Sequence, residues 1–450
     1  MKESRYNIWT ERGDSSYVYN GLSGALLRVA SDERRAIARV LDDPDARDGS
    51  PKVLEQLALG RMLVADETNE VDLLAKRYEL SRHDTSQLGL TIVTSLGCNF
   101  DCPYCFEAKH PSIMRDDVVA AVLDLLDSQL SNLRTLSVTW FGGEPLVGKK
   151  PLMELSDRFI ERCDQHGIEY SATITTNGYL LNRDMCEQLR DRRVGMVQVS
   201  LDGPPETHDR MRPLQNGDAT FGRIVENLHH AVDYFPVCIR MNVDVGNFPL
   251  TEQLLQILEA EGLSGKVNVY AGQIVGVSDG ADAPSASYKA PCFSNAEFAE
   301  AELEFKALTA RYGFSSPSLP RPSAAPCTAV RKNEVVVGSE GELYKCWDSV
   351  GNKLEVIGTI FDYQNPNGRL QRWLKYDPFT DDECTSCIAL PVCMGGCAHH
   401  GMDVIQHENR CSTFRHSFRD QVAAYVDHAE RTGATASVAP TGLVRPMDTR

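Results

Sequence analysis

The sequence predicts an α/β fold built on a partial (β/α)6 barrel of the TIM type. Six short, apolar, β-branched runs recur after residue 86, and amphipathic helical patterns separate them. Strands that alternate with helices form parallel βαβ units, and six such units fit a barrel or partial barrel of about 200 residues. Polar motifs follow the ends of several runs, where folds of this kind carry their chemistry. The expected strands span residues 88–95, 136–143, 170–178, 196–203, 237–245 and 266–274.

The helices expected between these strands complete the barrel unit, which we assign to residues 86–314. A loop rich in Gly, Ser, Ala and Pro over residues 276–294 follows the sixth strand and leads into one more helix. The expected helices span residues 116–130, 152–163, 183–192, 221–235, 251–262 and 296–313.

A small unit precedes the barrel over residues 1–85. Runs rich in Tyr, Ile and Val at 6–10 and 16–20 predict two strands on either side of a turn. Helical patterns follow at 31–43 and 50–64. Strands and helices in this number suggest a winged-helix-like module, and the alternative is a simple extension packed on the main domain.

The part of the chain after the barrel is rich in cysteine. Residues 315–326 form a Pro/Ser-rich linker, and we assign a cysteine-dense domain to residues 315–420. Residues 421–450 are expected to form a C-terminal helix and a mobile tail, because the stretch from Thr432 is rich in Thr, Ala and Pro.

Charge and hydropathy exclude several classes of partner. The net charge of the 450-residue chain is −17, which argues against nucleic acid because its binding needs a basic surface. No apolar run reaches the ~18 residues of a membrane span, and the first residues carry no apolar core of a signal peptide. The expectation is a cytoplasmic protein with no membrane partner.

Fourteen cysteines need an explanation, because disulfides are rare in the cytoplasm. Three lie in the run Cys98-x3-Cys102-x2-Cys105, and seven lie from Cys327 onward. Clustered cysteines in a reducing compartment indicate metal or iron–sulfur ligands. Zinc is the alternative for the first group, but zinc sites generally have four ligands, and the nearby His110 is expected on the surface.

Two further motifs follow expected strands. Gly142, Gly143 and Glu144 follow the second strand, where the glycines allow close approach of the backbone and the carboxylate can accept a hydrogen bond from an ammonium group. Ser200 and Asp202 follow the fourth strand and offer a hydroxyl and a carboxylate to a sugar.

The cysteine run and the motifs FGGEP, TTNG and SLDG, in this order over residues 88 to 275, resemble those of the radical S-adenosylmethionine (SAM) superfamily. The resemblance implies a partial TIM-type barrel. It also implies that Cys98, Cys102 and Cys105 hold a [4Fe-4S] cluster whose open iron binds the amino and carboxylate groups of SAM.

The same resemblance implies a set of SAM contacts. The residues concerned are Tyr104 for the adenine, Gly142, Gly143 and Glu144 for the methionine amine, and Ser200 and Asp202 for the ribose. Arg212 is a candidate for the SAM carboxylate, and the alternative for Arg212 is a surface salt bridge.

The C-terminal cysteines resemble the SPASM domain, a seven-cysteine pattern that binds two auxiliary [4Fe-4S] clusters, which makes three clusters in all. The implied ligands are Cys384, Cys387, Cys393 and Cys411 for the distal cluster and Cys327, Cys346 and Cys397 for the proximal one. An extra cysteine found in some members is replaced here by Asn333. The fourth proximal position is therefore filled by Cys292 from the preceding loop, or is open or taken by substrate.

Proteins with a SPASM domain mostly modify peptides or proteins. The resemblance implies an enzyme that cleaves SAM reductively to a 5′-deoxyadenosyl radical and takes hydrogen from a ribosomally made precursor peptide, forming a thioether or carbon–carbon cross-link. The N-terminal unit favours this function, because winged-helix-like modules of that group grip a leader peptide by strand addition. The expected electron partner is a low-potential donor such as flavodoxin or ferredoxin.

Two alternatives stay open. Anaerobic sulfatase-maturating enzymes, which form formylglycine, carry an Asp directly after the cysteine of Gly-x4-Cys. Here Trp347 follows Cys346 and Asp348 comes one position later, so that Asp348 is a catalytic candidate by position alone. The other alternative is an iron–sulfur electron-transfer protein, which would bind no SAM.

Overall fold

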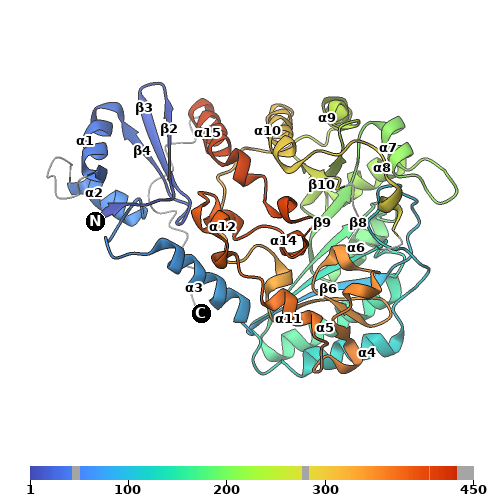
Figure 1. Cartoon of the computed structure of the whole chain (residues 1–450). Helices are drawn as coiled ribbons and strands as arrows, with labels where there is room; N and C mark the ends of the chain where they lie inside the picture. The colour runs from blue at the N-terminus through green and yellow to red at the C-terminus, as the bar shows by residue number, and fades with distance from the viewer. Residues whose placement is uncertain (43–50, 276–282, 405, 433–450) are drawn as a thin grey trace.

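The computed structural model describes residues 1–42, 51–275, 283–404 and 406–432. Its centre is a nine-stranded sheet in the order β11-β10-β9-β8-β7-β6-β12-β13-β14 (Figure 1). The strands from β6 to β11 pair in parallel and in sequence order, which confirms the expected βαβ repeat. They are β6 (Gln87–Ser95), β7 (Thr135–Gly142), β8 (Glu169–Thr176), β9 (Val194–Ser200), β10 (Val237–Val243) and β11 (Val267–Gln273).

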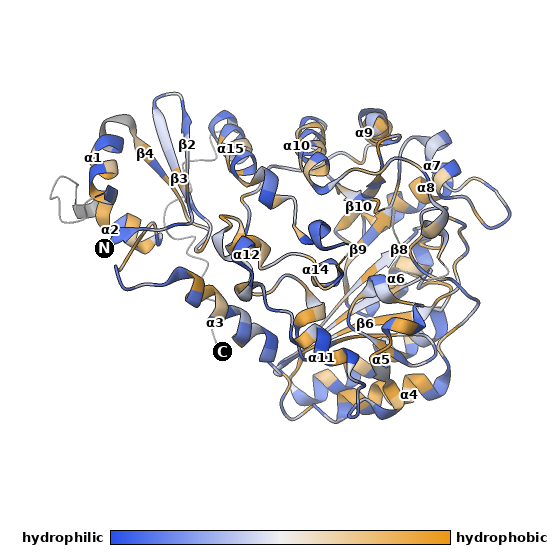
Figure 2. Ribbon diagram, viewed as in Figure 1, coloured by the Kyte–Doolittle hydropathy of each residue, from blue (hydrophilic) through white to orange (hydrophobic). Residues whose placement is uncertain are grey.

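Helices connect these strands and cover one face of the sheet. In β9 the side chains of Val197 and Val199 are fully buried in the same core as Leu189 and Ile224 of the helices, whereas Gln198 between them is half-exposed on the opposite face. The helices around the sheet carry both apolar and polar colours in Figure 2, as amphipathic helices should. They are α4 (Asp116–Asp127), α5 (Lys149–His166), α6 (Arg183–Asp191), α7 (Pro205–Met211), α8 (Phe221–Ala231), α9 (Thr251–Ala260) and α10 (Asn295–Arg311).

The cysteine-rich part extends the same sheet, which the sequence did not predict. β12 (Glu334–Val337) pairs in parallel with β6, and β13 (Glu342–Tyr344) and β14 (Gly358–Thr359) continue from it in antiparallel order. Four short helices and one long helix complete this part. They are α11 (Arg369–Leu374), α12 (Asp382–Ser386), α13 (Leu390–Cys393), α14 (Ala398–Gly401) and α15 (Phe414–Thr432). The predicted mobile tail lies outside the described residues.

The N-terminal part forms a separate three-stranded antiparallel sheet, at the left of Figure 1. One face, with Tyr17 and Tyr19, packs on Phe418 and Val422 of α15. The other face packs on α1 and α2. The elements are β1 (Lys2–Glu3), β2 (Asn7–Arg12), β3 (Ser15–Asn20), β4 (Leu26–Ala30), α1 (Ser31–Asp42), α2 (Pro51–Leu59), β5 (Leu63–Val64) and α3 (Glu70–His83). Strand β4 was not predicted from the sequence.

None of the helices in the described ranges combines the length and the apolar character needed to span a membrane.

Candidate functional site

The three clustered thiols lie on the loop that follows β6. Cys102 is buried, and Cys98 and Cys105 are half-buried. The segment after α7 holds this loop, because Gln215 Nε2 donates to the carbonyl oxygen of Cys98 at 2.7 Å. Burial raises the pKa of Cys98 and of Cys105 to about 12. The free thiols are therefore protonated near neutral pH, and a bound metal would have to displace their protons.

A lysine accompanies the three thiols. Lys109 Nζ donates to the carbonyl oxygen of Phe100 at 3.0 Å. Burial lowers the pKa of Lys109, but the thiolate forms of Cys105, Cys98 and Cys102 raise it by more, and the net shift is upward. Lys109 is therefore positioned to stabilise thiolates in this loop.

The two glycines after β7 let two segments of the chain approach closely. Gly142 has a φ of 133°, and a Cβ on it would lie 2.3 Å from the carbonyl oxygen of Ser95. A Cβ on Gly143 would lie 2.7 Å from the carbonyl oxygen of Leu96. Both positions require glycine, because the end of β7 packs directly against the start of the thiol loop.

Glu144 is fully buried, and protein groups bind both of its carboxylate oxygens. Oε1 accepts from Thr176 Oγ1 at 2.7 Å and from the backbone N–H of Leu146 at 3.0 Å, and Oε2 accepts from the backbone N–H of Asn177 at 2.7 Å. Burial raises the pKa of Glu144, although these hydrogen bonds oppose the shift. The TTNG motif thus fixes Glu144, and Asn177 Nδ2 also donates to Asn99 of the thiol loop at 2.8 Å.

Tyr104 is the centre of a buried polar cluster. Its hydroxyl donates to Asp202 Oδ2 and accepts from Arg212 Nη1 at 2.5 Å. Asp202 is fully buried and also accepts from Asn242 N at 2.9 Å and Asn242 Nδ2 at 3.0 Å. Arg212 Nη1 lies 3.6 Å from Asp202 Oδ2, so the salt bridge considered from the sequence exists but is buried. Within the described residues the Nε of Arg212 has no hydrogen-bond partner, which leaves a donor for a ligand.

A chain of hydrogen bonds through His208 and Thr220 links the backbone N–H of Asp202 to the backbone carbonyl oxygen of Arg212. The backbone N–H of Asp202 donates to His208 Nδ1 at 3.1 Å, so His208 Nε2 carries the proton and faces Thr220 Oγ1 at 3.1 Å. Thr220 Oγ1 then donates to the carbonyl oxygen of Arg212 at 2.8 Å. Burial, assisted by the charge of Arg212, holds the pKa of His208 well below its usual range and keeps the ring neutral.

The predicted SAM contacts therefore lie around the thiol loop, at the C-terminal ends of the strands. Ser200 is the last residue of β9, two residues before Asp202, and is buried and paired in register with Arg240 of β10. The thiols suit an iron–sulfur cluster, and the unpartnered Nε of Arg212 suits a carboxylate. The residues present thus fit a cluster with SAM, and the described ranges hold no tight set of three His, Cys, Asp or Glu side chains for a single metal ion.

The C-terminal cysteines gather in two groups. Burial raises the pKa of Cys346 well above its usual range, and Asp348 and the thiolate forms of Cys397 and Cys327 add to this rise, so the three cysteines are within electrostatic range of one another. The ring of His400 hydrogen-bonds to Cys397, and its Nδ1 lies 3.3 Å from the carbonyl oxygen of Asn409.

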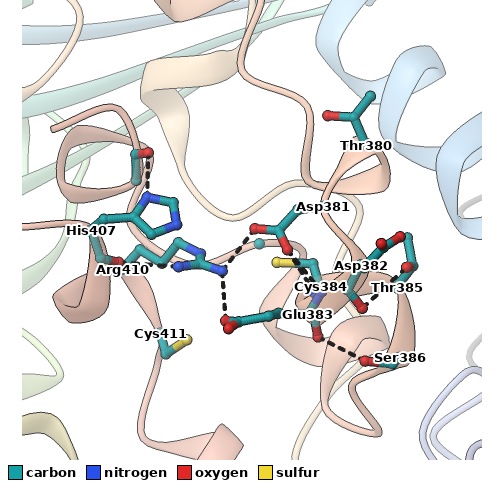
Figure 3. A network of polar contacts seen from close by, with 12 residues as sticks. Thr380, Asp381, Asp382, Glu383, Cys384, Thr385, Ser386, His407, Arg410 and Cys411 are labelled. Atoms are coloured by element: carbon teal, nitrogen blue, oxygen red, sulfur yellow. Dashed lines mark hydrogen bonds and ion pairs between the residues drawn. The ribbon is translucent and has the colours of Figure 1, made fainter. Parts of the chain in front are cut away.

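The second group contains Cys384, Cys387, Cys393 and Cys411: beyond burial, Cys393 raises the pKa of Cys384, and Cys393 and Cys411 raise the pKa of Cys387. Figure 3 shows the buried Arg410 between Cys384 and Cys411, where its Nη2 donates to Asp381 at 2.7 Å and to Glu383 at 3.0 Å. Its carbonyl oxygen accepts from the N–H of Cys397 at 2.7 Å. Arg410 thus contacts the thiol of Cys384 through its side chain and the backbone of Cys397 through its carbonyl oxygen.

Cys292 lies on the barrel side of the molecule. Its Sγ contacts the carbonyl oxygen of Ala290 at 3.5 Å, and its charged neighbour is Asp244 after β10. The same loop covers the first thiol group, because the N–H of Ser285 donates to the carbonyl oxygen of Cys105 at 2.9 Å. These contacts belong to the barrel, and none of them is with a C-terminal cysteine.

Asp348 comes two residues after Cys346 and is within electrostatic range of Glu107, close to the first thiol loop. Burial raises the pKa of Glu107 to about 8; Lys109 opposes this shift, and Asp348 and Glu144 add to it. Trp347 stacks on Phe141, with ring centroids 6.1 Å apart and planes at 26°. Trp347 occupies the position directly after Cys346, where sulfatase-maturating enzymes are expected to carry an Asp. Together with Phe141 it forms what we call the aromatic wall.

Comparison with known proteins identifies the central domain. Residues 92–248 match the model of the radical SAM superfamily. The serine-type anaerobic sulfatase-maturating enzyme of Bacteroides thetaiotaomicron is 30% identical over 30% of this chain and 35% of its own length. The Fe-coproporphyrin III synthase of Methanosarcina barkeri is 27% identical over 36% of this chain and 39% of its own. The chain thus spans little more than a third of these two relatives.

A longer match exists to the serine-type anaerobic sulfatase-maturating enzyme of Klebsiella pneumoniae, which is 24% identical over 72% of this chain and 85% of its own length. Among solved structures, anSMEcpe with bound AdoMet and Kp18Cys peptide has a TM-score of 0.55 at 19% identity, over 78% of this chain and 99% of that one. Streptococcus suis SuiB bound to precursor peptide SuiA has a TM-score of 0.50 at 15% identity, over 92% and 99%. At these identities the structural likeness is one of fold.

Proposed function

We propose that this chain, whose residues 92–248 match the radical SAM superfamily, is an enzyme that matures a ribosomally made precursor peptide by forming an intramolecular thioether or carbon–carbon cross-link. When bound at Cys98, Cys102 and Cys105, the iron–sulfur cluster with SAM would supply the radical chemistry needed to remove hydrogen from an unactivated C–H bond. The protein supplies orientation and excludes water.

The observation that carries this proposal is the Trp347–Phe141 stack beside the thiol loop. A sulfatase-maturating enzyme uses a carboxylate directly after the corresponding cysteine, whereas this chain has an indole there. Asp348, one residue later, is proposed as the group that takes a proton after hydrogen abstraction.

In the proposed enzyme the buried polar cluster holds SAM. Arg212 binds the carboxylate of SAM through its free Nε, and the relay from His208 to Thr220 fixes the Arg212 backbone. Tyr104 and Ser200 border the nucleoside, with Asp202 behind them. Gly142 and Gly143 bring Glu144 and the strand end against the thiol loop, where the methionine amine would lie.

The N-terminal sheet supports a peptide substrate. Its edge strands β2 and β4 each pair on one side only, and an edge strand can take up an extended peptide by strand addition. SuiB, which aligns over most of this chain, has been solved with its precursor peptide. We therefore propose this sheet as the site that grips a leader peptide.

The two C-terminal thiol groups are proposed to hold auxiliary [4Fe-4S] clusters, the proximal one at Cys346 and the distal one at Cys384. These clusters would carry an electron away from the substrate radical, as an oxidative product requires. A low-potential flavodoxin or ferredoxin is the proposed source of the first electron.

The test is to incubate the anaerobically reconstituted enzyme with SAM, a reductant and the peptide encoded by a small neighbouring reading frame. A cross-link gives a product lighter by two hydrogen atoms that resists fragmentation between the joined residues. Oxidation of serine to formylglycine gives the same mass loss, but an aldehyde-trapping reagent then reacts. Deoxyadenosine without any change in peptide mass would exclude the cross-link.

Sulfatase maturation is the second candidate, favoured by the match over 85% of the Klebsiella pneumoniae enzyme. A sulfatase peptide that becomes reactive toward the aldehyde reagent would establish it. No such product, together with a cross-linked precursor peptide, would exclude it.

A further inference from the structure

One arginine of the central sheet has a side chain that takes part in none of the contacts described above. In β10 the side chains of Ile239 and Met241 are fully buried in the core beneath the helices, so Arg240 between them points to the opposite face of the sheet. Arg240 is half-buried there, and within the described residues its Nε has no hydrogen-bond partner. An enclosed donor without a partner is costly, so an acceptor is missing at this place.

Gly272 of β11 fixes the position of the guanidinium group. A Cβ on Gly272 would collide with the Nε of Arg240 and would lie 2.8 Å from its Nη2. In the register of the two strands Gly272 lies across from Asn242, whose amide donates to Asp202 at 3.0 Å. The side chain of Arg240 therefore runs toward the C-terminal ends of β10 and β11, next to the buried polar cluster around Tyr104.

Tyr270 is the neighbour of Arg240 on the same face. The two residues are paired in register, and the hydroxyl of Tyr270 donates to Gln198 Oε1 at 2.5 Å. Burial raises the pKa of Tyr270, and Arg240 opposes this rise through its charge and a hydrogen bond. Tyr270 is nevertheless 39% exposed, so a ligand can reach this part of the face.

The groups around the guanidinium are polar but uncharged. Arg212 has Asp202 at ion-pair distance, whereas no carboxylate of a described residue lies within that distance of Arg240. Its register partner in β9 is Ser200, and Gln198 precedes Ser200 on the same face. An arginine held in place without a carboxylate is a ready donor for one, because its planar fork matches the geometry of a carboxylate.

Resting on the proposed function, we propose that Arg240 binds the carboxylate of an acidic residue, aspartate or glutamate, in the substrate peptide. The carboxylate accepts charge-assisted hydrogen bonds from the guanidinium group. Since the Oε1 of Gln198 already accepts from Tyr270, the amide nitrogen of Gln198 remains as a further donor. The residue so bound lies beside Ser200, where the nucleoside of SAM is proposed, and Arg240 determines which part of the peptide is presented there.

The test uses the full chain, reconstituted anaerobically, with SAM and without reductant, so that no radical forms. The probes are acetyl-glycyl-glutamyl-glycinamide and acetyl-glycyl-glutaminyl-glycinamide, whose blocked ends leave the side chain as the one difference in charge. Their affinities are measured by ligand-observed NMR. The glutamyl peptide should bind about tenfold more tightly or better, as a hydrogen bond to a charged group allows, and an aspartyl peptide should share this preference.

Variants locate the preference. Arg240→Gln should bring the ratio of the two affinities close to one, and Arg240→Lys should restore part of it, because lysine keeps the charge but lacks the fork. Gly272→Ala should lower the ratio by pushing the guanidinium aside while its charge remains. Arg223→Gln removes the same charge from an exposed arginine of α8 and should keep the full ratio. Iron content and SAM affinity are measured for each variant.

Equal binding of the two probes, or a glutamyl preference that survives in Arg240→Gln, would overturn the proposal. So would a loss of SAM affinity in Arg240→Gln with an unchanged ratio, which would assign the arginine to SAM. Since no radical forms in this experiment, its failure leaves the cross-linking assay unaffected. Conversely, a glutamyl preference in an enzyme that modifies no precursor peptide would preserve this site and refute the proposed function.

Discussion

At the scale of single residues, Gly142 is the position at which the backbone tolerates least change. Its φ of 133° disfavours any side chain, and a Cβ there would lie only 2.3 Å from the carbonyl oxygen of Ser95. We expect Gly142→Ala to cost about 2–3 kcal/mol from backbone strain alone and to displace the thiol loop. Urea unfolding and iron content measure the two effects.

Gly195→Ala is the matched control, since its Cβ would meet nothing closer than 3.8 Å. That variant should keep its iron and most of its stability. Full iron content in Gly142→Ala would show that the thiol loop does not depend on this contact.

The raised pKa of Glu107 predicts how stability depends on pH. Burial raises this pKa from 4.5 to about 8, so the folded chain retains a proton that the unfolded chain has released. Stability is therefore lost as pH rises from about 4.5 to 8. Glu107→Gln removes this loss, and the cluster-free variant should be more stable than its parent by a few kcal/mol above pH 8 and equal to it below pH 4. If the urea midpoints of Glu107→Gln and of its parent changed in parallel with pH across this range, the raised pKa would not belong to Glu107.

The sequence named most of the residues around the thiol loop, but not those that hold them. Tyr104, Asp202 and Arg212 follow motifs at strand ends and were predicted. Asn242 could have been found, because it lies inward at the end of an expected strand. His208 gave no such signal, since a histidine in a short helix is recognisable as a relay only once its hydrogen-bond partners are known.

At the scale of elements, the length of a strand and the period of its hydrophobic residues decide whether the sequence can predict that strand. The six barrel strands have seven to nine residues and turn signals at their ends, and all six were predicted. Strands β12 to β14 have two to four residues, too few for a period to show. β12 exists because it pairs with β6, where Glu334 lies across Gly89, and that pairing is a tertiary contact.

Helix α15 connects the N-terminal sheet to the rest of the molecule. Phe418 is 2% exposed and packs edge-on against Tyr19, with ring centroids 5.9 Å apart. Phe418→Ala should remove about 3–5 kcal/mol of packing and increase amide exchange in β2 and β3, with β8 unchanged. Arg419→Ala, at the exposed neighbouring position, is the control. Unaltered protection of β2 and β3 would mean that the sheet does not rely on α15.

At the scale of the whole molecule, the candidate site is assembled from three parts of the chain. The thiol loop follows β6, the buried cluster follows β9 and β10, and the aromatic wall joins Phe141 to Trp347 across the sheet extension. Spacing along the sequence predicted that the strand ends would meet. It could not predict that Ala108 would contact Gly351, because no local pattern encodes a contact between segments more than two hundred residues apart.

This arrangement also predicts that Cys292 does not complete the proximal group. Cys292 contacts Ala290 and lies near Asp244 on the barrel side, whereas Cys346 lies with Cys397. Cys292→Ala should therefore keep the iron content and the electron paramagnetic resonance signals of the reconstituted enzyme, and Cys346→Ala should lose about four iron atoms per chain, the content of one [4Fe-4S] cluster. An equal loss in both variants would make Cys292 the fourth ligand, and the loop that carries it would then have to bridge the barrel and the cysteine-rich part.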